Sequence, residues 1–508
     1  MIGPLIALGA GVVLSAALPP TGVWPALIAL AVLFGMVSHA ERPGEAFGLG
    51  AWFALGFFAL YVLWVPMSFA LPSMLGPFFW LLYPLLLLAL AAIWGLVTWA
   101  AHLVAGRGGS VLFVLPVFWV LMEWARSQGY FAFPWGSLGY TWLETPVAQL
   151  ADTVGVTGLS LLSAACASAL AAPFAARSER RLRRDGPAVG RIVAPIVAVL
   201  VLGGSWWWGS TKLDAPLGPL EATALLVQPN VDPFARAVSA RQELAIHTTI
   251  TEIGLSAMAA PPDLVIWPEG ALLGLEIEGN VGAEVRSQVQ ASAPASEFIL
   301  GARGRSADRS YNSAFAIASA AVVDRYDKHV LVPFGERWPL LEEAAPLYRG
   351  VFGALGLPML QNTSPGVGPV PLATGLGPVA LLVCYESVFP EVTNAMVAAG
   401  ARVLITITND AWFARGNGAR QHFDMGRFRA IETRRFLLRS ANDGITGLVD
   451  PFGRVVAQLP RGVASQLPVR FGLRDEITPF VRYGGFLPGG LAGLGLLVSV
   501  GAALRRRT

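Results

Sequence analysis

Residues 377–390 read GPVALLVCYESVFP, and this stretch decides what kind of domain the carboxyl half of the chain forms. An apolar run leads directly to Cys384, where Tyr385 and Glu386 interrupt it. A short apolar run bounded by turn and polar residues is typical of a buried strand. Because the chain contains only 2 cysteines, the position of one of them at the end of such a strand, beside a Tyr-Glu pair, needs an explanation.

The same alternation of short apolar runs and longer amphipathic stretches recurs from about residue 221 onward. It predicts strands and helices that alternate along the chain, which is the pattern of an α/β domain with a sizeable core. The predicted strands are 222–228, 263–269, 297–303, 313–319, 379–386, 402–410 and 446–456. The predicted helices are 240–259, 281–293, 388–400 and 419–437.

Several of these predicted strands end in polar residues. The strand at 263–269 ends in Glu269, the strand at 379–386 ends around Cys384, and the strand at 402–410 ends in Asp410. In open α/β sheets, ligands bind beyond the carboxyl ends of the strands. These three residues are therefore candidates for one site, although they lie far apart in the sequence.

The composition points to a membrane. Hydrophobic residues make up 54% of the chain, charged residues 14%, and the mean hydropathy is +0.57. A soluble protein carries about 25% charged residues, so much of the excess apolar surface must face lipid. The 2 cysteines exclude a disulfide framework, and the sequence has no metal-binding motif and no glycine-rich phosphate loop. We expect no metal site, no cofactor and no nucleic-acid partner.

Long apolar runs fill the amino-terminal 210 residues and recur at the carboxyl end. A membrane-spanning helix needs about 20 mainly apolar residues. Such runs lie near 3–20, 24–40, 47–68, 77–104, 109–125, 156–176, 191–210 and 486–504. The first run lacks the basic start of a signal peptide, so we expect an uncleaved span. The predicted domains are 1–210 with seven membrane helices, 221–470 as the extramembrane α/β domain, and 486–504 as an eighth membrane helix.

Arginines gather in alternate loops between these runs. They are Arg42, Arg107, a cluster at 177–191, and Arg505 to Arg507 at the end, whereas 21–23 and 69–76 contain no Lys or Arg. The positive-inside rule then places both termini in the cytoplasm and residues 211–485 on the outer side. The runs contain almost no ionisable groups, which argues against a solute pathway and favours a membrane anchor or the wall of a lipid-binding cavity.

A nucleophilic site can be assembled from the polar strand ends and the segment YDKHVLVPFGERWP. A base such as Glu269 could remove the thiol proton of Cys384, and Lys328 could stabilise an oxyanion together with the Tyr385 N–H. The plainer interpretations stay open at this point. A lone cysteine at a strand end is most often a small buried apolar residue, and a Lys-His pair usually faces water. His329 and His422 would also permit a Cys-His pair.

Three segments resemble the signature segments of the nitrilase, or carbon-nitrogen hydrolase, superfamily: IWPEG at 266–270, YDKHVLVPFGE at 326–336 and VCYES at 383–387. The resemblance implies an αββα sandwich with a Glu-Lys-Cys triad. By match of segment, Glu269 would be the general base, Lys328 the oxyanion-stabilising lysine and Cys384 the nucleophile. Glu336 matches a further family glutamate that supports the site.

A longer similarity covers nearly the whole chain and is most specific in the carboxyl half. TITNDAWF at 406–413, the segment 421–455 and the apolar runs on both sides resemble the bacterial apolipoprotein N-acyltransferase family. This resemblance implies that Tyr385 and Glu386 also support activity. Pro229 and Ala414 stand where the family usually has glycine.

The resemblance implies the reaction and its place. An acyl chain would pass from a phosphatidylethanolamine-like phospholipid to the α-amine of a diacylated apolipoprotein, through a thioester and with ping-pong kinetics, as the last step of lipoprotein maturation. The enzyme would lie in the bacterial inner membrane with a periplasmic catalytic domain. The apolar segment 338–360 is a candidate for a membrane-facing lid, or else for a packed surface helix. The alternatives are a membrane-tethered nitrilase-type amidase and a non-catalytic membrane scaffold.

Overall fold

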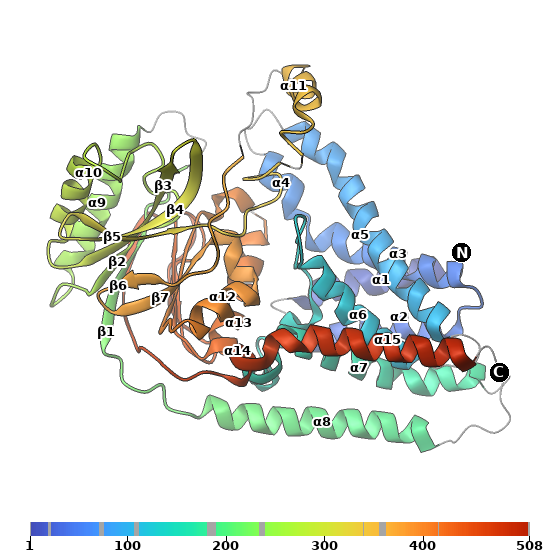
Figure 1. Cartoon of the computed structure of the whole chain (residues 1–508). Coiled ribbons are helices and arrows are strands. Elements are labelled where there is room, and N and C mark those ends of the chain that lie inside the picture. The colour runs from blue at the N-terminus through green and yellow to red at the C-terminus, as the bar shows by residue number, and fades with distance from the viewer. Residues whose placement is uncertain are drawn as a thin grey trace.

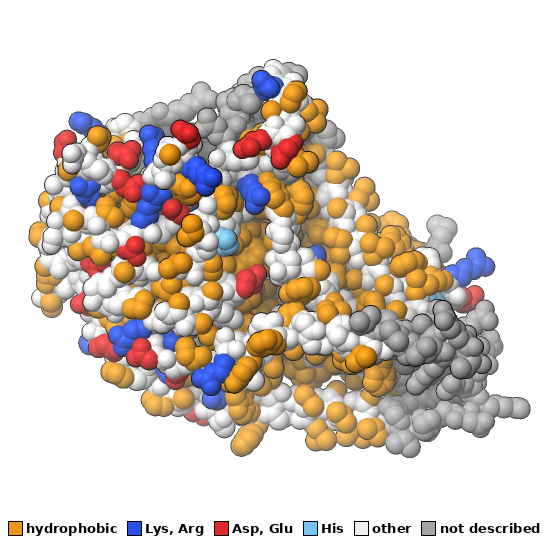
Figure 2. All heavy atoms as spheres, viewed as in Figure 1, with side chains coloured by type: hydrophobic (Ala, Val, Ile, Leu, Met, Phe, Trp, Pro, Cys, Tyr) orange, Lys and Arg blue, Asp and Glu red, His pale blue; other side chains and the backbone are white. Residues whose placement is uncertain are grey.

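The protein consists of a helix bundle and a two-sheet body that lie side by side (Figure 1). The computed structural model describes residues 2–18, 22–70, 76–105, 111–179, 189–232, 239–338, 340–354, 362–414 and 416–505. Charged side chains gather over the sheets, whereas the visible surface of the bundle is mainly hydrophobic (Figure 2). This contrast is what a membrane-embedded bundle beside a water-exposed body requires.

The apolar runs of the sequence all fall on helices. The helices of this part are α1 Ile2–Ala16, α2 Val23–His39, α3 Pro43–Tyr61, α4 Trp64–Ala70, α5 Gly76–Ala105, α6 Val111–Arg126, α7 Ala151–Glu179, α8 Val189–Leu213 and α15 Leu487–Arg505. Among the described residues, four stretches are long and apolar enough to cross a membrane: Pro43–Ser68, Leu82–Ala105, Pro146–Phe174 and Val193–Leu213. The third predicted run, 47–68, is divided between α3 and α4.

Helices α1 and α3 cross at two glycines. A β-carbon added at Gly11 would overlap the carbonyl oxygen of Phe53, and one added at Gly56 would overlap that of Leu8. Small residues at such a crossing let two backbones approach closely, which is the usual way in which helices associate within lipid. Helix α8 differs, because it lies along the edge of the bundle and exposes apolar side chains such as Leu200 and Trp207 (Figure 1).

The carboxyl half forms two six-stranded sheets. The first has the order β12-β1-β2-β3-β4-β5 and the second has the order β11-β10-β9-β8-β7-β6. Strands β1, β2 and β3 run parallel, as do β7, β8 and β9. The strands of the first sheet are β1 Ala222–Gln228, β2 Leu264–Ile266, β3 Glu297–Ser306, β4 Arg309–Ala318, β5 Ala321–Asp327 and β12 Ser465–Phe471. Those of the second are β6 Leu372–Thr374, β7 Gly377–Val383, β8 Leu404–Thr408, β9 Leu437–Ala441, β10 Gly447–Val449 and β11 Val455–Gln458.

The alternation of side chains along β1 shows how the sheets are layered. Leu225 and Val227 pack on the apolar side of the helix that follows, whereas Leu226 belongs to the core that also holds Leu381 and Leu404 of the second sheet. The sheets therefore pack face to face with helices outside, which confirms the αββα sandwich. The outer helices are α9 Ala240–Ser256 and α10 Ala283–Ser292 on the first sheet and α12 Pro390–Ala398 and α13 Gly418–Thr433 on the second.

One predicted strand is wrong. The segment 446–456 is not a single strand but a hairpin of β10 and β11, because a tight turn interrupts it. Asp450 accepts hydrogen bonds from the backbone N–H groups of Phe452 and Arg454, and Gly453 has a φ of 81°. An aspartate that caps its own turn and a glycine with positive φ are strong turn formers, and they outweigh the apolar residues on either side.

The segment proposed as a lid is partly described. Helix α11, Ala345–Ala354, stands beyond the sheets, next to α4 and the start of α5 (Figure 1). Leu347 on this helix is 67% exposed. Residues 339 and 355–360 lie outside the described residues. The lid therefore stays a prediction.

Candidate active site

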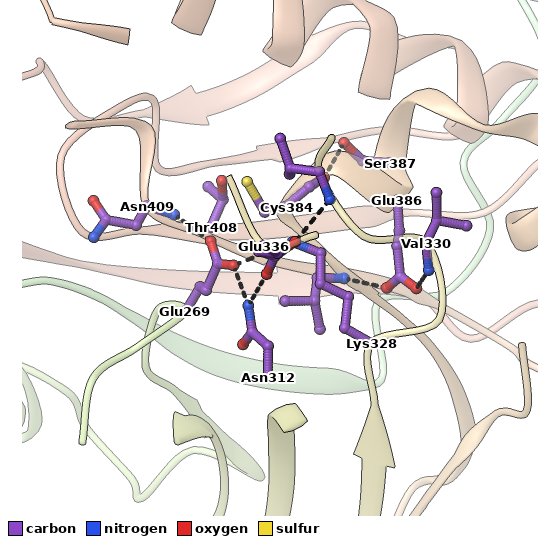
Figure 3. A network of polar contacts seen from close by, with 12 residues as sticks. Glu269, Asn312, Lys328, Val330, Glu336, Cys384, Glu386, Ser387, Thr408 and Asn409 are labelled. Atoms are coloured by element: carbon purple, nitrogen blue, oxygen red, sulfur yellow. Dashed lines mark hydrogen bonds and ion pairs between the residues drawn. The ribbon is translucent and has the colours of Figure 1, made fainter. Parts of the chain in front are cut away.

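The predicted nucleophile lies on a sharp turn at the end of β7. Cys384 follows Val383 directly and begins the 3-10 helix Cys384–Val388, with a φ of 53°. A non-glycine residue in this left-handed region costs about 1–3 kcal/mol and persists only where its surroundings fix it. The turn points the half-buried thiol away from the sheet, toward the predicted base and lysine (Figure 3).

Glu386 is the anchor of this turn. Its carboxylate is fully buried and accepts a hydrogen bond from the Val383 N–H at 2.9 Å. Its other oxygen accepts from the Tyr326 hydroxyl at 2.8 Å and from the backbone N–H groups of His329 and Val330 at 2.7 and 3.1 Å. Glu386 therefore ties the strand end before the cysteine to the loop that carries the lysine, which explains why the residue supports the site.

Lys328 is held between two carboxylates. Its ammonium nitrogen lies 2.8 Å from Glu336 Oε2 and 3.4 Å from Glu269 Oε1, and the side chain is 1% exposed. Burial alone would lower the pKa of Lys328, but the charges of Glu336 and Glu269 outweigh it and raise that pKa well above its ordinary value. The lysine is therefore a fixed positive charge beside the Cys384 thiol.

Two asparagines that the sequence does not single out position the predicted base. The Asn312 side-chain amide donates to Glu269 at 2.8 Å and to Glu336 at 2.7 Å. The backbone N–H of Asn409 donates to the other Glu269 oxygen at 3.0 Å. Asn312 lies at the polar start of a strand, where an asparagine normally faces water, so the sequence carries no signal of this role.

The thiol of Cys384 is held in its protonated form. Burial and the nearby Glu269 carboxylate raise its pKa above the ordinary value, and they outweigh Lys328 and a hydrogen bond from Thr408, which act in the opposite direction. These surroundings therefore disfavour a thiolate–ammonium pair between Cys384 and Lys328. Attack by this thiol would require a base, and the Glu269 carboxylate lies nearby (Figure 3).

Asp410 and His422 lie behind the cysteine rather than in front of it. His422 Nε2 faces the Cys384 carbonyl oxygen at 3.0 Å, and its Nδ1 faces Asp410 Oδ1 at 3.0 Å. The contact of His422 is therefore with the backbone of the cysteine, not with its sulfur, and His329 Nδ1 faces the Gly366 carbonyl oxygen at 3.0 Å, so neither of the two histidines is placed as the partner of the thiol. Within the described part of the chain, no group of three or more His, Cys, Asp or Glu residues could hold a metal ion.

The helix bundle closes one side of the site with aromatic rings. The Tyr385 hydroxyl donates to the carbonyl oxygen of Ala132 at 2.6 Å, and its ring stacks on Trp135 at 5.6 Å. Both partners belong to the segment that follows α6. Nearby, Phe131 contacts Phe334, which belongs to the loop after Lys328, at 5.9 Å. The turn of the predicted nucleophile thus packs on the segment that directly follows α6.

Comparison with known proteins links both halves of the chain to one family. Residues 10–169 match the family model described as the apolipoprotein N-acyltransferase N-terminal domain, and residues 224–465 match that described as carbon-nitrogen hydrolase. A protein of Geobacter metallireducens named apolipoprotein N-acyltransferase is 32% identical over 498 residues, which cover 94% of this chain and 91% of that protein. A protein of the same name from Azotobacter vinelandii is 33% identical over 522 residues, which cover 99% of this chain and 95% of that protein.

Among solved structures, a carbon-nitrogen hydrolase from Helicobacter pylori G27 is similar to the sheet-containing half. It is 17% identical, with a TM-score of 0.38, and the match covers 49% of this chain and 89% of that one.

Proposed function

This chain belongs to the apolipoprotein N-acyltransferase family, and we propose that Glu269, Lys328 and Cys384 carry out its acyl transfer. It is a membrane protein and an N-acyltransferase whose substrates are a lipid and a lipoprotein. The donor is a phosphatidylethanolamine-like phospholipid, and the acceptor is the α-amine of the diacylglyceryl-cysteine at the amino terminus of the lipoprotein.

One observation carries this proposal. The turn that holds Cys384 packs through Tyr385 on the segment that directly follows α6, where Tyr385 bonds to Ala132 and stacks on Trp135. A thiol in this place can be reached by a lipid ester that leaves the bilayer sideways. A thioester formed here is also partly shielded from water, so that an amine can compete for it. A site for a soluble amide would gain nothing from such a position.

In the first half-reaction, Glu269 takes the thiol proton of Cys384 as the sulfur attacks the ester carbonyl of the phospholipid. The Lys328 ammonium and the Tyr385 N–H stabilise the negative oxygen of the tetrahedral intermediate, where each such donor contributes about 10²–10³ in rate. The intermediate then expels the lysophospholipid oxygen, which receives the proton from Glu269. A thioester on Cys384 remains.

In the second half-reaction, the lipoprotein amine attacks the thioester carbonyl and gives a proton to Glu269. The same two donors hold the second oxyanion. Collapse of this intermediate breaks the carbon–sulfur bond, forms the amide, and returns the proton to Cys384. The donor product leaves before the acceptor reacts, which gives ping-pong kinetics.

The proposal includes the orientation in the membrane. In Figure 1 both chain ends lie at the end of the bundle that is away from the sheets. Arg42, between α2 and α3, is one of the basic loop residues that the positive-inside rule assigns to the cytoplasm. We place the termini in the cytoplasm, residues 221–470 in the periplasm and the helices of 1–210 and 486–504 in the inner membrane.

Mass spectrometry of the full-length enzyme tests this function. After incubation with phosphatidylethanolamine alone, we expect the peptide that contains Cys384 to gain one acyl group, and Cys384→Ser to gain none. Addition of a synthetic diacylated lipopeptide should remove the acyl group and give a triacylated lipopeptide. A wild-type enzyme that forms no adduct from phospholipid but hydrolyses a soluble amide would instead support the amidase.

A further inference from the structure

The peptide group between Cys384 and Tyr385 has the proposed oxyanion donor at one end and the Cys384 carbonyl oxygen at the other. A trans peptide group is planar, and its N–H and C=O point in opposite directions. The Tyr385 amide lies in the first turn of the 3-10 helix Cys384–Val388, where N–H groups have no acceptor within the helix. Whatever holds the Cys384 oxygen therefore sets the direction of the Tyr385 N–H.

Two buried side chains hold that oxygen. The Ser387 hydroxyl donates to it at 2.9 Å, and His422 Nε2 lies 3.0 Å from it. The Ser387 hydroxyl also lies 2.9 Å from His422 Nε2, and both side chains are 0% exposed. We assign a proton to Nε2. Without it, the lone pair of this nitrogen would face the Cys384 carbonyl oxygen, and two acceptors would repel each other.

A further set of buried charges holds His422 in place. Its Nδ1 lies 3.0 Å from Asp410 Oδ1 and 3.1 Å from Arg439 Nη2. Asp410 in turn accepts from Arg439 at 2.7 Å and from the Thr408 hydroxyl at 3.0 Å. Burial opposes ionisation of Asp410, but Arg439 and His422 outweigh it and keep the pKa of the carboxyl below its ordinary value. The ring of His422 is thus fixed from the end of β8, which lies beside β7, and from β9, the next strand in the sheet.

We propose that His422 and Ser387 are positioning residues that aim the Tyr385 N–H at the oxyanion by holding the opposite end of its peptide group. They also polarise the amide, since a hydrogen bond to a carbonyl strengthens the N–H of the same group as a donor. The inference rests on the proposed function, because it assigns a role to groups around the same cysteine. In this proposal His422 helps to stabilise the oxyanion and does not activate the thiol.

The rates of acylation and of alkylation of Cys384 distinguish a role at the oxyanion from a role at the thiol. Acylation of Cys384 by phosphatidylethanolamine forms an oxyanion, whereas alkylation of the same thiol by iodoacetamide does not. For His422→Leu we expect single-turnover acylation to fall about 10²-fold, the effect of a lost oxyanion donor, with an unchanged rate of alkylation. Aminolysis of the preformed thioester should fall by a similar factor. His422→Gln can place an amide N–H near the position of Nε2 and should recover much of the loss.

The controls keep this test specific. His247 is also a buried histidine, 2% exposed, but it packs on Trp267 on the outer face of the first sheet. His247→Leu should change neither rate. Ser387→Ala should show the same pattern as His422→Leu with a smaller effect, and it carries the test if His422→Leu does not fold.

Three results would overturn the inference: an unchanged acylation rate in His422→Leu, an equal loss in alkylation and acylation, or no recovery in His422→Gln. The wild-type enzyme and Cys384→Ser are run in parallel. If the wild-type enzyme forms no adduct from phospholipid, the proposed function itself fails. If it does so and the His422 variants behave like it, only the role of His422 fails.

Discussion

Cys384 needs a base at the moment of attack, because its surroundings disfavour the thiolate. Burial is the largest cause of the raised pKa, and the charge of Glu269 adds to it. The same carboxylate that disfavours the thiolate is the group that we propose accepts the proton during the reaction. The thiol therefore stays protonated until a substrate carbonyl is present.

The closeness of the Glu269 carboxylate to the Cys384 thiol predicts how alkylation of Cys384 depends on pH. Below the pKa of a thiol, the thiolate fraction rises with pH, so a raised pKa moves the plateau of the alkylation rate to higher pH. We expect the rate with iodoacetamide, followed by mass spectrometry of the Cys384 peptide, to keep rising beyond the pH at which the unfolded chain levels off. Glu269→Gln removes a negative charge and should shift the profile to lower pH while acyl transfer falls. A wild-type plateau below that of the unfolded chain would contradict this account.

Replacement of Glu386 by glutamine, the corresponding amide, should not be tolerated. Glutamine keeps one acceptor oxygen but places an NH₂ group where the carboxylate now accepts a hydrogen bond, for example from the Val383 N–H. A lost hydrogen bond to a buried charged group costs about 1.5–3 kcal/mol, so Glu386→Gln should lower the melting temperature and acyl transfer together. The exposed Glu252 on α9 offers the control Glu252→Gln, for which both should stay unchanged. Wild-type transfer by Glu386→Gln would show that the anchor is dispensable.

At the scale of elements, the membrane helices depend on close approach. Gly11 and Gly56 allow α1 and α3 to cross, whereas a β-carbon at Gly9 of α1 would meet nothing within 4 Å. The pair Gly9 and Gly56 therefore offers one change at a helix crossing and one in open space.

We predict that Gly56→Ala lowers the melting temperature of the enzyme in detergent. The added carbon must push α1 and α3 apart, at a cost of about 1–3 kcal/mol for overpacking. Gly9→Ala should leave the melting temperature unchanged or raise it, because alanine favours the helix. Equal melting temperatures for the two variants would mean that the crossing does not limit stability.

The extramembrane elements show what periodicity can and cannot predict. Buried strands such as β1 and β8 are continuous apolar runs, and the sequence predicts them. Strands β11 and β12 are partly exposed and lie at the outer edge of each sheet. β11 overlaps the predicted strand 446–456, whereas β12 was not predicted and contains Pro468, which a central strand does not tolerate. β12 forms because β1 offers a free edge, which no local pattern reports.

At the scale of the whole molecule, two ion pairs join the sheets to the bundle, and one of them is buried. The Arg434 guanidinium lies 2.7 Å from Asp152 Oδ2 at the start of α7 and donates to Gln149 at 2.6 Å. Arg427 of α13 also reaches Glu144 at 2.6 Å, although the side chain of Glu144 is 48% exposed. These contacts hold the two halves in the register that lets Tyr385 bond to Ala132.

Breaking this joint should affect stability and activity together. Removing one partner of a buried ion pair costs about 3–5 kcal/mol, so Asp152→Asn should lower the melting temperature and slow acyl transfer. The pair Arg402–Asp475 is exposed, with side chains 33% and 74% accessible, and Asp475→Asn should change the stability by no more than about 1 kcal/mol. If Asp152→Asn and Asp475→Asn change the melting temperature and the transfer rate equally, the burial of the Arg434–Asp152 pair does not contribute.

The sequence by itself determined the apolar helices, buried strands such as β1, β7 and β8, and the polar residues at their carboxyl ends, because these depend on local patterns of burial, but it missed the buried strand β9. Motif resemblance added Glu269, Lys328 and Cys384 as a set. Only the tertiary structure decided what holds them. Tyr385 and Ala132 are 253 residues apart in the chain, and His422 is 38 residues from the carbonyl that it faces. A hydrogen bond depends on distance and direction in space, which no spacing along the chain encodes.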